Sequence, residues 1–165
     1  MLYPIGIQNF SDLRQGGYVY VDKTHLLHSL YSNGKYYFLS RPRRFGKSLL
    51  ISTMQAFFEG KKELFKGLAI EELEKEWNEF PVLRIDFTGK KYSSIEDLYS
   101  MLDKHLGAFE AQYGIKQRYP SMDLRFQTII EAAYRCTGRQ VVILIDEYDK
   151  PIVDNIGNDE LVSTF

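Results

Sequence analysis

The sequence predicts an α/β fold in which a parallel sheet is flanked by helices. Three segments, at 35–40, 82–87 and 141–145, are short and rich in aromatic or β-branched residues, as buried strands are. Between them lie segments in which apolar residues recur at the period of a helix. Because strands that are joined through helices pair in parallel, this alternation favours a parallel sheet.

Each predicted strand has its own signal. Segment 35–40 is aromatic and follows the turn-forming pair Asn33-Gly34. Segment 82–87 is bounded by a proline and a glycine. Segment 141–145 is a continuous apolar run, which is typical of a central strand covered on both faces.

The predicted helices share an apolar stripe or an acidic, helix-favouring composition. They cover the segments 50–58, 68–77, 95–109 and 126–133. In the first of them, Leu50 and Phe57 fall on one face. Ser94 and Asp97 have the spacing of a capping box before the third helix, and Gly138 is placed to end the fourth.

The composition excludes several classes of protein. With 44% hydrophobic and 26% charged residues among 165, the chain is neither collagen-like nor disordered. Its net charge of -1 gives no general attraction to nucleic acid or to membranes. No apolar run approaches the length of a membrane span, and the N-terminus does not resemble a signal peptide. A single cysteine, Cys136, excludes an internal disulfide, so we expect a cytoplasmic protein.

A candidate phosphate-binding loop lies between the first predicted strand and the first predicted helix. There, Gly46 would let the backbone approach a phosphate, Lys47 would reach the β- and γ-phosphates, and the Ser48 hydroxyl would ligate Mg²⁺. The general pattern G-x-x-x-x-G-K-[ST] requires glycine where this chain has Arg41. The neighbouring strand and helix nevertheless favour phosphate binding.

Two interpretations of this basic turn stay open. In one of them, Arg41, Arg43 and Arg44 add contacts to phosphate oxygens, for which guanidinium groups are well suited. In the other, these charges are solvated, and Lys47 belongs to an ordinary turn that opens a helix.

A second candidate element is the acidic pair that follows the last predicted strand. In parallel sheets, ligands bind beyond the carboxyl ends of the strands. Asp146 would hold magnesium there and Glu147 would polarise an attacking water. The alternative is that Asp146 caps the next helix. The pairing of this element with Gly46-Lys47-Ser48, in the right order and at strand ends, favours a site for ATP and Mg²⁺.

These motifs stand within longer blocks that share a family likeness. The blocks lie at 3–10, 20–24, 38–48, 58–60 and 144–149. Together they closely resemble the predicted AAA-ATPase-like family of bacterial and archaeal P-loop proteins. The most specific block is S-R-P-R-R-F-G-K-S at 40–48, which resembles that family's own form of the Walker A loop and accounts for Arg41.

The resemblance implies a P-loop NTPase-type sheet and a role for each site residue. It implies nucleotide binding by the loop residues Arg43, Arg44, Phe45, Gly46, Lys47, Ser48 and Leu49. It makes Lys47 and Glu147 catalytic and assigns the metal to Ser48 and Asp146. More weakly, it implies that Asp22, Lys23 and Thr24 line a base pocket.

The resemblance also predicts the organisation of the chain, with an N-terminal extension at 1–34 and a nucleotide-binding core at 35–165. Family members are typically longer, and many carry a C-terminal domain similar to PD-(D/E)XK nucleases. We therefore expect a fragment whose sheet is incomplete at the C-terminus. The strand expected between the Walker A and Walker B strands would be missing, so hydrolysis by this chain alone would be weak or absent.

Three functions are compatible with these expectations. The first is an ATPase that depends on Mg²⁺ in the intact protein, with ATP as its partner and homo-oligomerisation left open. The second is a nucleotide-binding switch that does not hydrolyse ATP. The third is a nucleic-acid-associated protein linked to a nuclease-like domain, which the near-neutral charge does not support. No membrane partner is expected.

Overall fold

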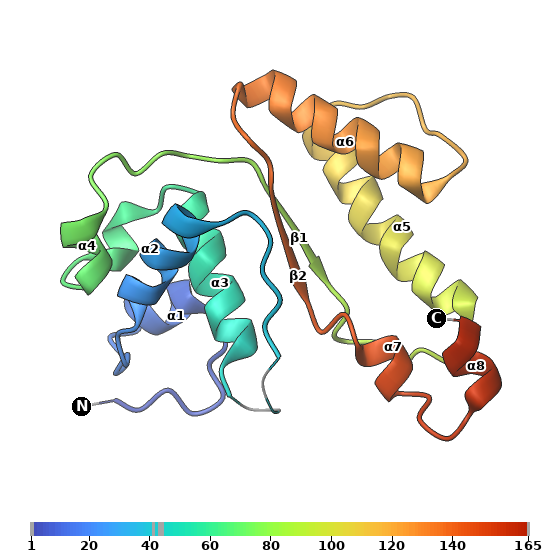
Figure 1. The fold of residues 1–165 in the computed structure, drawn as a ribbon, viewed down its shortest axis with the longest axis horizontal. Helices are drawn as coiled ribbons and strands as arrows, with labels where there is room; N and C mark the ends of the chain where they lie inside the picture. The colour runs from blue at the N-terminus through green and yellow to red at the C-terminus, as the bar shows by residue number, and fades with distance from the viewer. Residues whose placement is uncertain (1, 41, 43–44, 165) are drawn as a thin grey trace. The chain divides into compact units, whose positions relative to one another are not determined.

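The computed structural model describes residues 2–40, 42 and 45–164, with the backbone alone at 160, 161 and 164. It is a mixed structure of helices and strands (Figure 1). The chain divides into two compact units, Met1–Phe80 and Pro81–Phe165, and each is described by itself. The functional division expected between 34 and 35 stays a prediction.

The first unit is built from short helices (Figure 1). They are α1 (Phe10–Gln15), α2 (Thr24–Asn33), α3 (Lys47–Phe58), the 3₁₀ helix η1 (Lys62–Phe65) and α4 (Ala69–Leu73). The predicted helix at 50–58 is therefore confirmed, whereas the one expected over 68–77 is reduced to the five residues of α4. Trp77 has a φ of 47°, which no continued helix permits.

An aromatic cluster forms the core of the first unit. Phe57, near the end of α3, makes edge-to-face contacts with Tyr31, Phe65 and Trp77 at ring-centroid distances of 5.6 to 6.1 Å. Such contacts add to the free energy gained by burying each ring. The aromatic residues therefore hold α2, α3 and η1 together in place of a sheet.

The strand predicted at 35–40 is wrong in this structure. These residues have no regular secondary structure, and the side chain of Tyr36 is 94% exposed. A strand needs a neighbour to accept and donate its backbone hydrogen bonds. The described part of the first unit contains no strand that could pair with this segment. It contains an isolated β-bridge, between Leu2 and Tyr18.

Asp22 and Thr24 connect the start of α2 to the start of α4. The Asp22 carboxylate accepts a hydrogen bond from the N–H of Ala69 at 2.7 Å, and the Thr24 hydroxyl accepts one from Ile70 at 3.1 Å. Partial burial raises the pKa of Asp22, but hydrogen bonds from Ala69 and Thr24 outweigh it and hold that pKa below its ordinary value. Both side chains therefore cap α4, and their base-pocket role stays a prediction.

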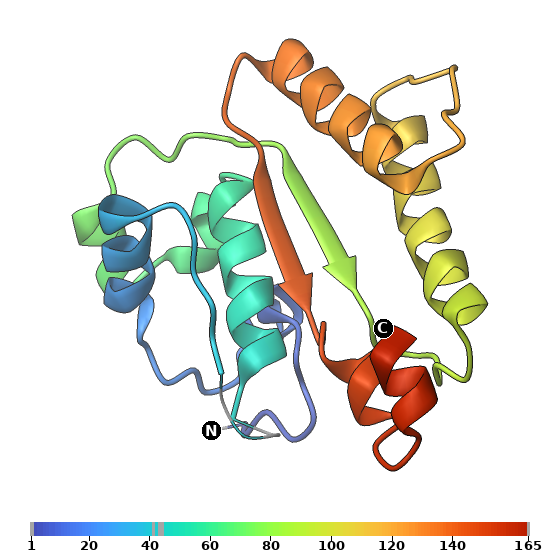
Figure 2. The same cartoon turned by 45° about the vertical axis from the view of Figure 1, so that its right-hand side comes forward.

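The second unit contains a two-stranded parallel sheet flanked by helices (Figure 2). Its elements are β1 (Val82–Asp86), α5 (Ile95–Gln112), α6 (Met122–Thr137), β2 (Val142–Asp146), α7 (Lys150–Val153) and α8 (Asp159–Thr164). The last two predicted strands and their parallel pairing are thus confirmed. The register pairs Val82 with Val142 and Asp86 with Asp146, so both strands end at the same edge.

The core of this unit lies between the sheet and the helix pair. Leu83 and Ile85 of β1 are buried in one cluster with Leu106 and Phe109 of α5 and Ile129 of α6. Figures 1 and 2 both show α5 and α6 on the β1 side of the sheet. The helices predicted at 95–109 and 126–133 are thus confirmed, and their apolar side chains form this core.

The expectation that 141–145 is a central strand covered on both faces is wrong. Leu144 is buried, but Ile143 and Ile145 are 41% and 47% exposed. A central strand has a neighbour at each edge, and among the described residues β2 pairs with β1 alone. A continuous apolar run therefore does not by itself distinguish a central strand from an edge strand.

The predicted helix ends of the second unit agree with the observed ones only in part. Gly138 ends α6 with a φ of 66°, as predicted. Ser94 is the N-cap of α5, but the Asp97 carboxylate accepts its hydrogen bond from the N–H of Ser93, at 2.9 Å, and pairs with Lys90 at 2.7 Å. The capping box is thus replaced by a related arrangement one residue earlier.

A buried ionic network joins α5 to α6. The Arg125 guanidinium donates two hydrogen bonds to the Glu110 carboxylate, at 2.6 and 2.8 Å, and one to Asp103 at 2.5 Å. Arg118 pairs with the same Asp103 oxygen. Because the Arg125 side chain is 3% exposed, its charge depends on these carboxylates for compensation. No pattern in the sequence indicated this network.

Candidate functional site

Helix α3 begins on a glycine in the left-handed region. Gly46 has a φ of 74° and is the N-cap residue, and its carbonyl accepts a hydrogen bond from the N–H of Leu50 at 2.9 Å. A Cβ added to Gly46 would meet no atom within 4 Å, so the glycine is required by its conformation and not by lack of space. Because Gly46 has no side chain, the N-cap position itself supplies no capping hydrogen bond.

The start of α3 presents backbone N–H groups and the positive end of the helix dipole. These groups belong to Lys47, Ser48 and Leu49, the first three residues of the helix. A helix start of this kind attracts anions, phosphate in particular. The described end of the predicted phosphate loop, from Gly46 to Leu49, therefore has a backbone geometry that suits an anion.

The helix is also held in place. The Ser52 hydroxyl accepts a hydrogen bond from the N–H of Phe10, at the start of α1, at 2.8 Å, and Ser52 is buried. Lys47 and Ser48 are half-buried, whereas Phe45 is 63% exposed. The remaining loop arginines, 41, 43 and 44, lie outside the described residues.

The acidic element lies at the carboxyl ends of the two parallel strands. Asp146, the last residue of β2, is 3% exposed, and its Oδ2 has no hydrogen-bond partner in the part of the chain that the structure describes. The Nη2 atom of Arg84 lies 3.5 Å from this oxygen and 3.4 Å from Oδ2 of Asp86. Two carboxylates thus flank one guanidinium at this edge of the sheet.

Glu147 has an unusual backbone conformation. Its φ of 53° lies in the left-handed region, which for a residue other than glycine is strained by about 1–3 kcal/mol. The strain accompanies the turn between β2 and α7, in which the Glu147 carbonyl accepts a hydrogen bond from the N–H of Lys150 at 3.0 Å. Strained backbone of this kind is concentrated at functional sites.

The structure brings some of the predicted residues together. Asp146 and Glu147 are consecutive at the end of β2 in the second unit. Gly46 to Leu49 are consecutive at the start of α3 in the first unit. The meeting of the two groups around one ligand stays a prediction.

Comparison with known proteins identifies the family. A family model described as a predicted AAA-ATPase matches residues 4–165. The chain belongs to this AAA-ATPase-like family. A protein of Azotobacter chroococcum mcd 1, described as an uncharacterized protein in the vnfD 5′ region, is 42% identical over 159 residues. The match covers 96% of this chain but 31% of that relative, so the chain spans about a third of the relative's length. No solved structure matches.

The residues of the AAA-ATPase-like chain fit the magnesium ion that the family implies. A buried carboxylate oxygen without a hydrogen-bond partner, as in Asp146, suits a hard cation or one of its bound waters. No cluster of three or more histidine, cysteine or acidic side chains that could hold a metal exists among the described residues. A magnesium ion held by one or two protein groups and by substrate phosphates matches this sparse donor set.

Sequence reasoning missed Asp86 and Arg84 in this AAA-ATPase-like chain. The signal was present, because Asp86 stands one residue before the end of the second predicted strand, 82–87, and Asp146 directly follows the third, 141–145. In a parallel pair the carboxyl ends meet at one edge, and the observed register makes these two residues direct neighbours. The position of Arg84, two residues before Asp86, then places it on the same face of β1.

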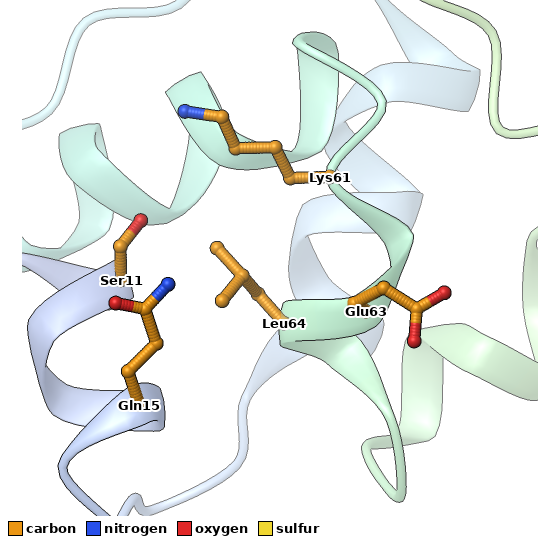
Figure 3. A pocket seen from close by; sticks show the side chains of 5 residues that line it. All are labelled: Ser11, Gln15, Lys61, Glu63 and Leu64. Carbon is orange, nitrogen blue, oxygen red and sulfur yellow. The ribbon is translucent and has the colours of Figure 1, made fainter.

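A shallow pocket in the first unit of the AAA-ATPase-like chain is separate from the predicted loop. Ser11, Gln15, Lys61, Glu63 and Leu64 line it, and Figure 3 shows Leu64 between the polar side chains. Residues 61–64 follow the end of α3, whereas Lys47 begins this helix, which is about 18 Å long. In addition, Lys61 pairs with Glu59 at 2.6 Å. The pocket therefore contributes nothing to the predicted site.

The sequence predicts no membrane-spanning segment, because no apolar run approaches the required length. No helix in the described part of the chain is long and apolar enough to cross a bilayer.

Proposed function

We propose that this chain is the nucleotide-binding part of a P-loop ATPase that depends on Mg²⁺. The observation that carries the proposal is the start of α3, a helix that opens on a left-handed glycine followed by Lys47 and Ser48. This geometry suits the phosphates of ATP. Membership of the predicted AAA-ATPase family supports ATP as the nucleotide. The proposal includes a P-loop sheet with more strands than the two that the structure describes.

In this proposal the loop binds and orients the triphosphate. The N–H groups of Lys47, Ser48 and Leu49 donate to phosphate oxygens, and the Lys47 ammonium compensates the charge that develops on the transferred phosphoryl group. The loop residues Arg43, Arg44 and Phe45 complete the binding segment. Magnesium, when bound, supplies charge neutralisation of the phosphates.

The second unit supplies the acidic groups. The Ser48 hydroxyl and the Asp146 carboxylate would hold the metal, and the Glu147 carboxylate orients the attacking water and accepts its proton. The strained backbone conformation of Glu147 supports this role, because that conformation sets the direction in which the side chain projects from the backbone. The proposal requires Lys47, Asp146 and Glu147 to approach one triphosphate.

Binding of a fluorescent ATP analogue in the presence of Mg²⁺ tests the proposal. We expect Lys47→Ala to weaken binding by at least about tenfold, because a charge-assisted contact to phosphate contributes roughly 1.5–3 kcal/mol. Lys62→Ala is the matched control, since Lys62 is an exposed lysine at the start of η1 in the same unit, and it should bind like wild type. Equal affinity of wild type and Lys47→Ala would overturn the proposal.

A further inference from the structure

The edge of the sheet in the second unit holds more charge than the proposed function uses. Asp86 and Asp146 are direct partners in the parallel register, so their backbones lie about 4.8 Å apart. Two carboxylates side by side repel each other, and this repulsion is stronger where water is excluded, as it is around Asp146. A cation beside the pair compensates part of this charge and so reduces the repulsion.

Arg84 supplies that cation. Its Nη2 lies 3.4 Å from Asp86 Oδ2 and 3.5 Å from Asp146 Oδ2. Both distances are longer than those of a close charge-assisted hydrogen bond, which measures about 2.7–2.9 Å. The guanidinium therefore balances both carboxylates by charge without binding either of them tightly.

The two carboxylates differ in what else they contact. Oδ1 of Asp86 accepts a hydrogen bond from the N–H of Thr88 at 2.8 Å, and the Asp86 side chain is 30% exposed. Oδ2 of Asp146 is buried and has no hydrogen-bond partner among the described residues. Asp146 is thus the carboxylate still able to accept a ligand, and Asp86 is the one anchored to the backbone.

We propose that Arg84 and Asp86 are positioning residues for the metal carboxylate. In the absence of metal, Arg84 balances the charge of Asp146. When a divalent cation binds at Asp146, the guanidinium is repelled by it and is retained by Asp86. This inference rests on the proposed function for its assignment of Asp146 to the metal.

The proposal predicts opposite effects for the two positioning residues. Removing the Arg84 charge removes a competitor for Asp146, so metal should bind more tightly. Removing the Asp86 charge leaves the Asp146 carboxylate, 3.5 Å from Nη2 of Arg84, to attract the guanidinium, so metal should bind more weakly. A purely structural role would weaken metal binding in both variants.

Titration of the full chain with Mn²⁺, without nucleotide, tests this prediction by the electron paramagnetic resonance signal of free Mn²⁺. We expect Arg84→Met to lower the Mn²⁺ Kd about three- to tenfold and Asp86→Asn to raise it about threefold. Asp146→Asn should abolish specific binding. Lys90→Met is the matched control, because it removes a cation that pairs with Asp97 in the same unit, and its Kd should equal that of wild type.

Each outcome decides the matter. The proposal is supported if Arg84→Met binds Mn²⁺ more tightly than wild type and Asp86→Asn binds it more weakly. Circular dichroism must show that both variants are folded. If Arg84→Met does not fold, Arg84→Gln replaces it with the same expectation. An unchanged or weaker affinity of the Arg84 variant, or no specific Mn²⁺ binding by wild type, overturns the proposal.

The test separates this inference from the proposed function. If Lys47-dependent ATP binding is found but the Arg84 variant does not change Mn²⁺ affinity, the inference fails alone. If the order of Mn²⁺ affinities holds but wild type binds no ATP, the ATPase proposal fails and Asp146 remains a metal ligand positioned by Arg84.

Discussion

The two units of this chain hold features suited to ligands of opposite charge, and these features arise by different physical means. In the first unit, the features that suit an anion belong to the backbone, namely a left-handed glycine and the N–H groups at the start of α3. In the second, the features that suit a cation are side chains, namely Asp86 and Asp146, which the register of two strands makes neighbours. Substitutions should therefore act through conformation in the first unit and through charge in the second.

The largest expected effect separates binding from hydrolysis. Glu147→Gln removes the carboxylate that we propose accepts a proton from water but keeps the shape of the side chain, so single-turnover ATP hydrolysis should fall about 10²- to 10⁴-fold. ATP affinity should stay within about twofold of wild type, in contrast to Lys47→Ala. The measurement uses the intact protein. Equal hydrolysis rates in wild type and variant would instead favour a switch that binds ATP without hydrolysing it.

The second expected effect concerns stability of the second unit. Arg125→Met leaves Glu110 buried without its partner, and the free energy of unfolding should fall by about 3 kcal/mol in urea titrations. Arg135→Met is the control. Because its pair with Glu131 lies on the exposed surface of the same helix, that substitution should cost less than about 0.5 kcal/mol. Similar losses in the two variants would show that the network is not a buried one.

A smaller effect tests the backbone contribution in the first unit. Gly46→Ala forces a side chain into the left-handed region and should cost about 1–2 kcal/mol of stability. Gly107→Ala is the matched control in the interior of α5, where the added methyl group also meets nothing within 4 Å and φ is not positive. This control should gain about 0.5–1 kcal/mol. Thermal unfolding measures both, and a neutral Gly46→Ala would contradict the assigned conformation.

The smallest effect is on the pH dependence of stability. Hydrogen bonds from Arg125 hold the pKa of Glu110 below its ordinary value. In acid, the folded chain therefore binds fewer protons than the unfolded chain, and stability rises with pH. The contribution of Glu110 is complete above its unfolded pKa, about 4.3, and is lost as the pH falls through the folded pKa. Urea midpoints between pH 3 and pH 6 should change less steeply in Arg125→Met than in wild type.

Much of the fold could be predicted from local patterns. The helices around Leu50, Leu106 and Ile129 follow from apolar periodicity, because a stripe of this kind is buried only if the segment is helical. The end of α6 at Gly138 follows from the left-handed conformation that glycine readily adopts. Both signals are contained within a few neighbouring residues.

Sequence patterns were less informative about structures that need a partner from a distant part of the chain. Segment 35–40 has the composition of a strand, yet a strand exists only beside another one, and the described part of its unit offers none. The same limit applies to β2, whose apolar run resembles that of a central strand although Ile143 and Ile145 are half exposed. The ionic network of Arg125 depends on the packing of α5 against α6, which no local spacing encodes.

The sequence by itself determined the family, the order of the motifs and the residues whose side chains suit phosphate and metal, because these are properties of side-chain type and of short spacing. Only the tertiary structure decided which residues surround them. It made Asp86 the neighbour of Asp146, placed Arg84 between them, and gave Asp22 and Thr24 the role of capping α4. These relations join residues about 45 to 60 positions apart, and strand register and helix packing, not local preference, bring such residues together.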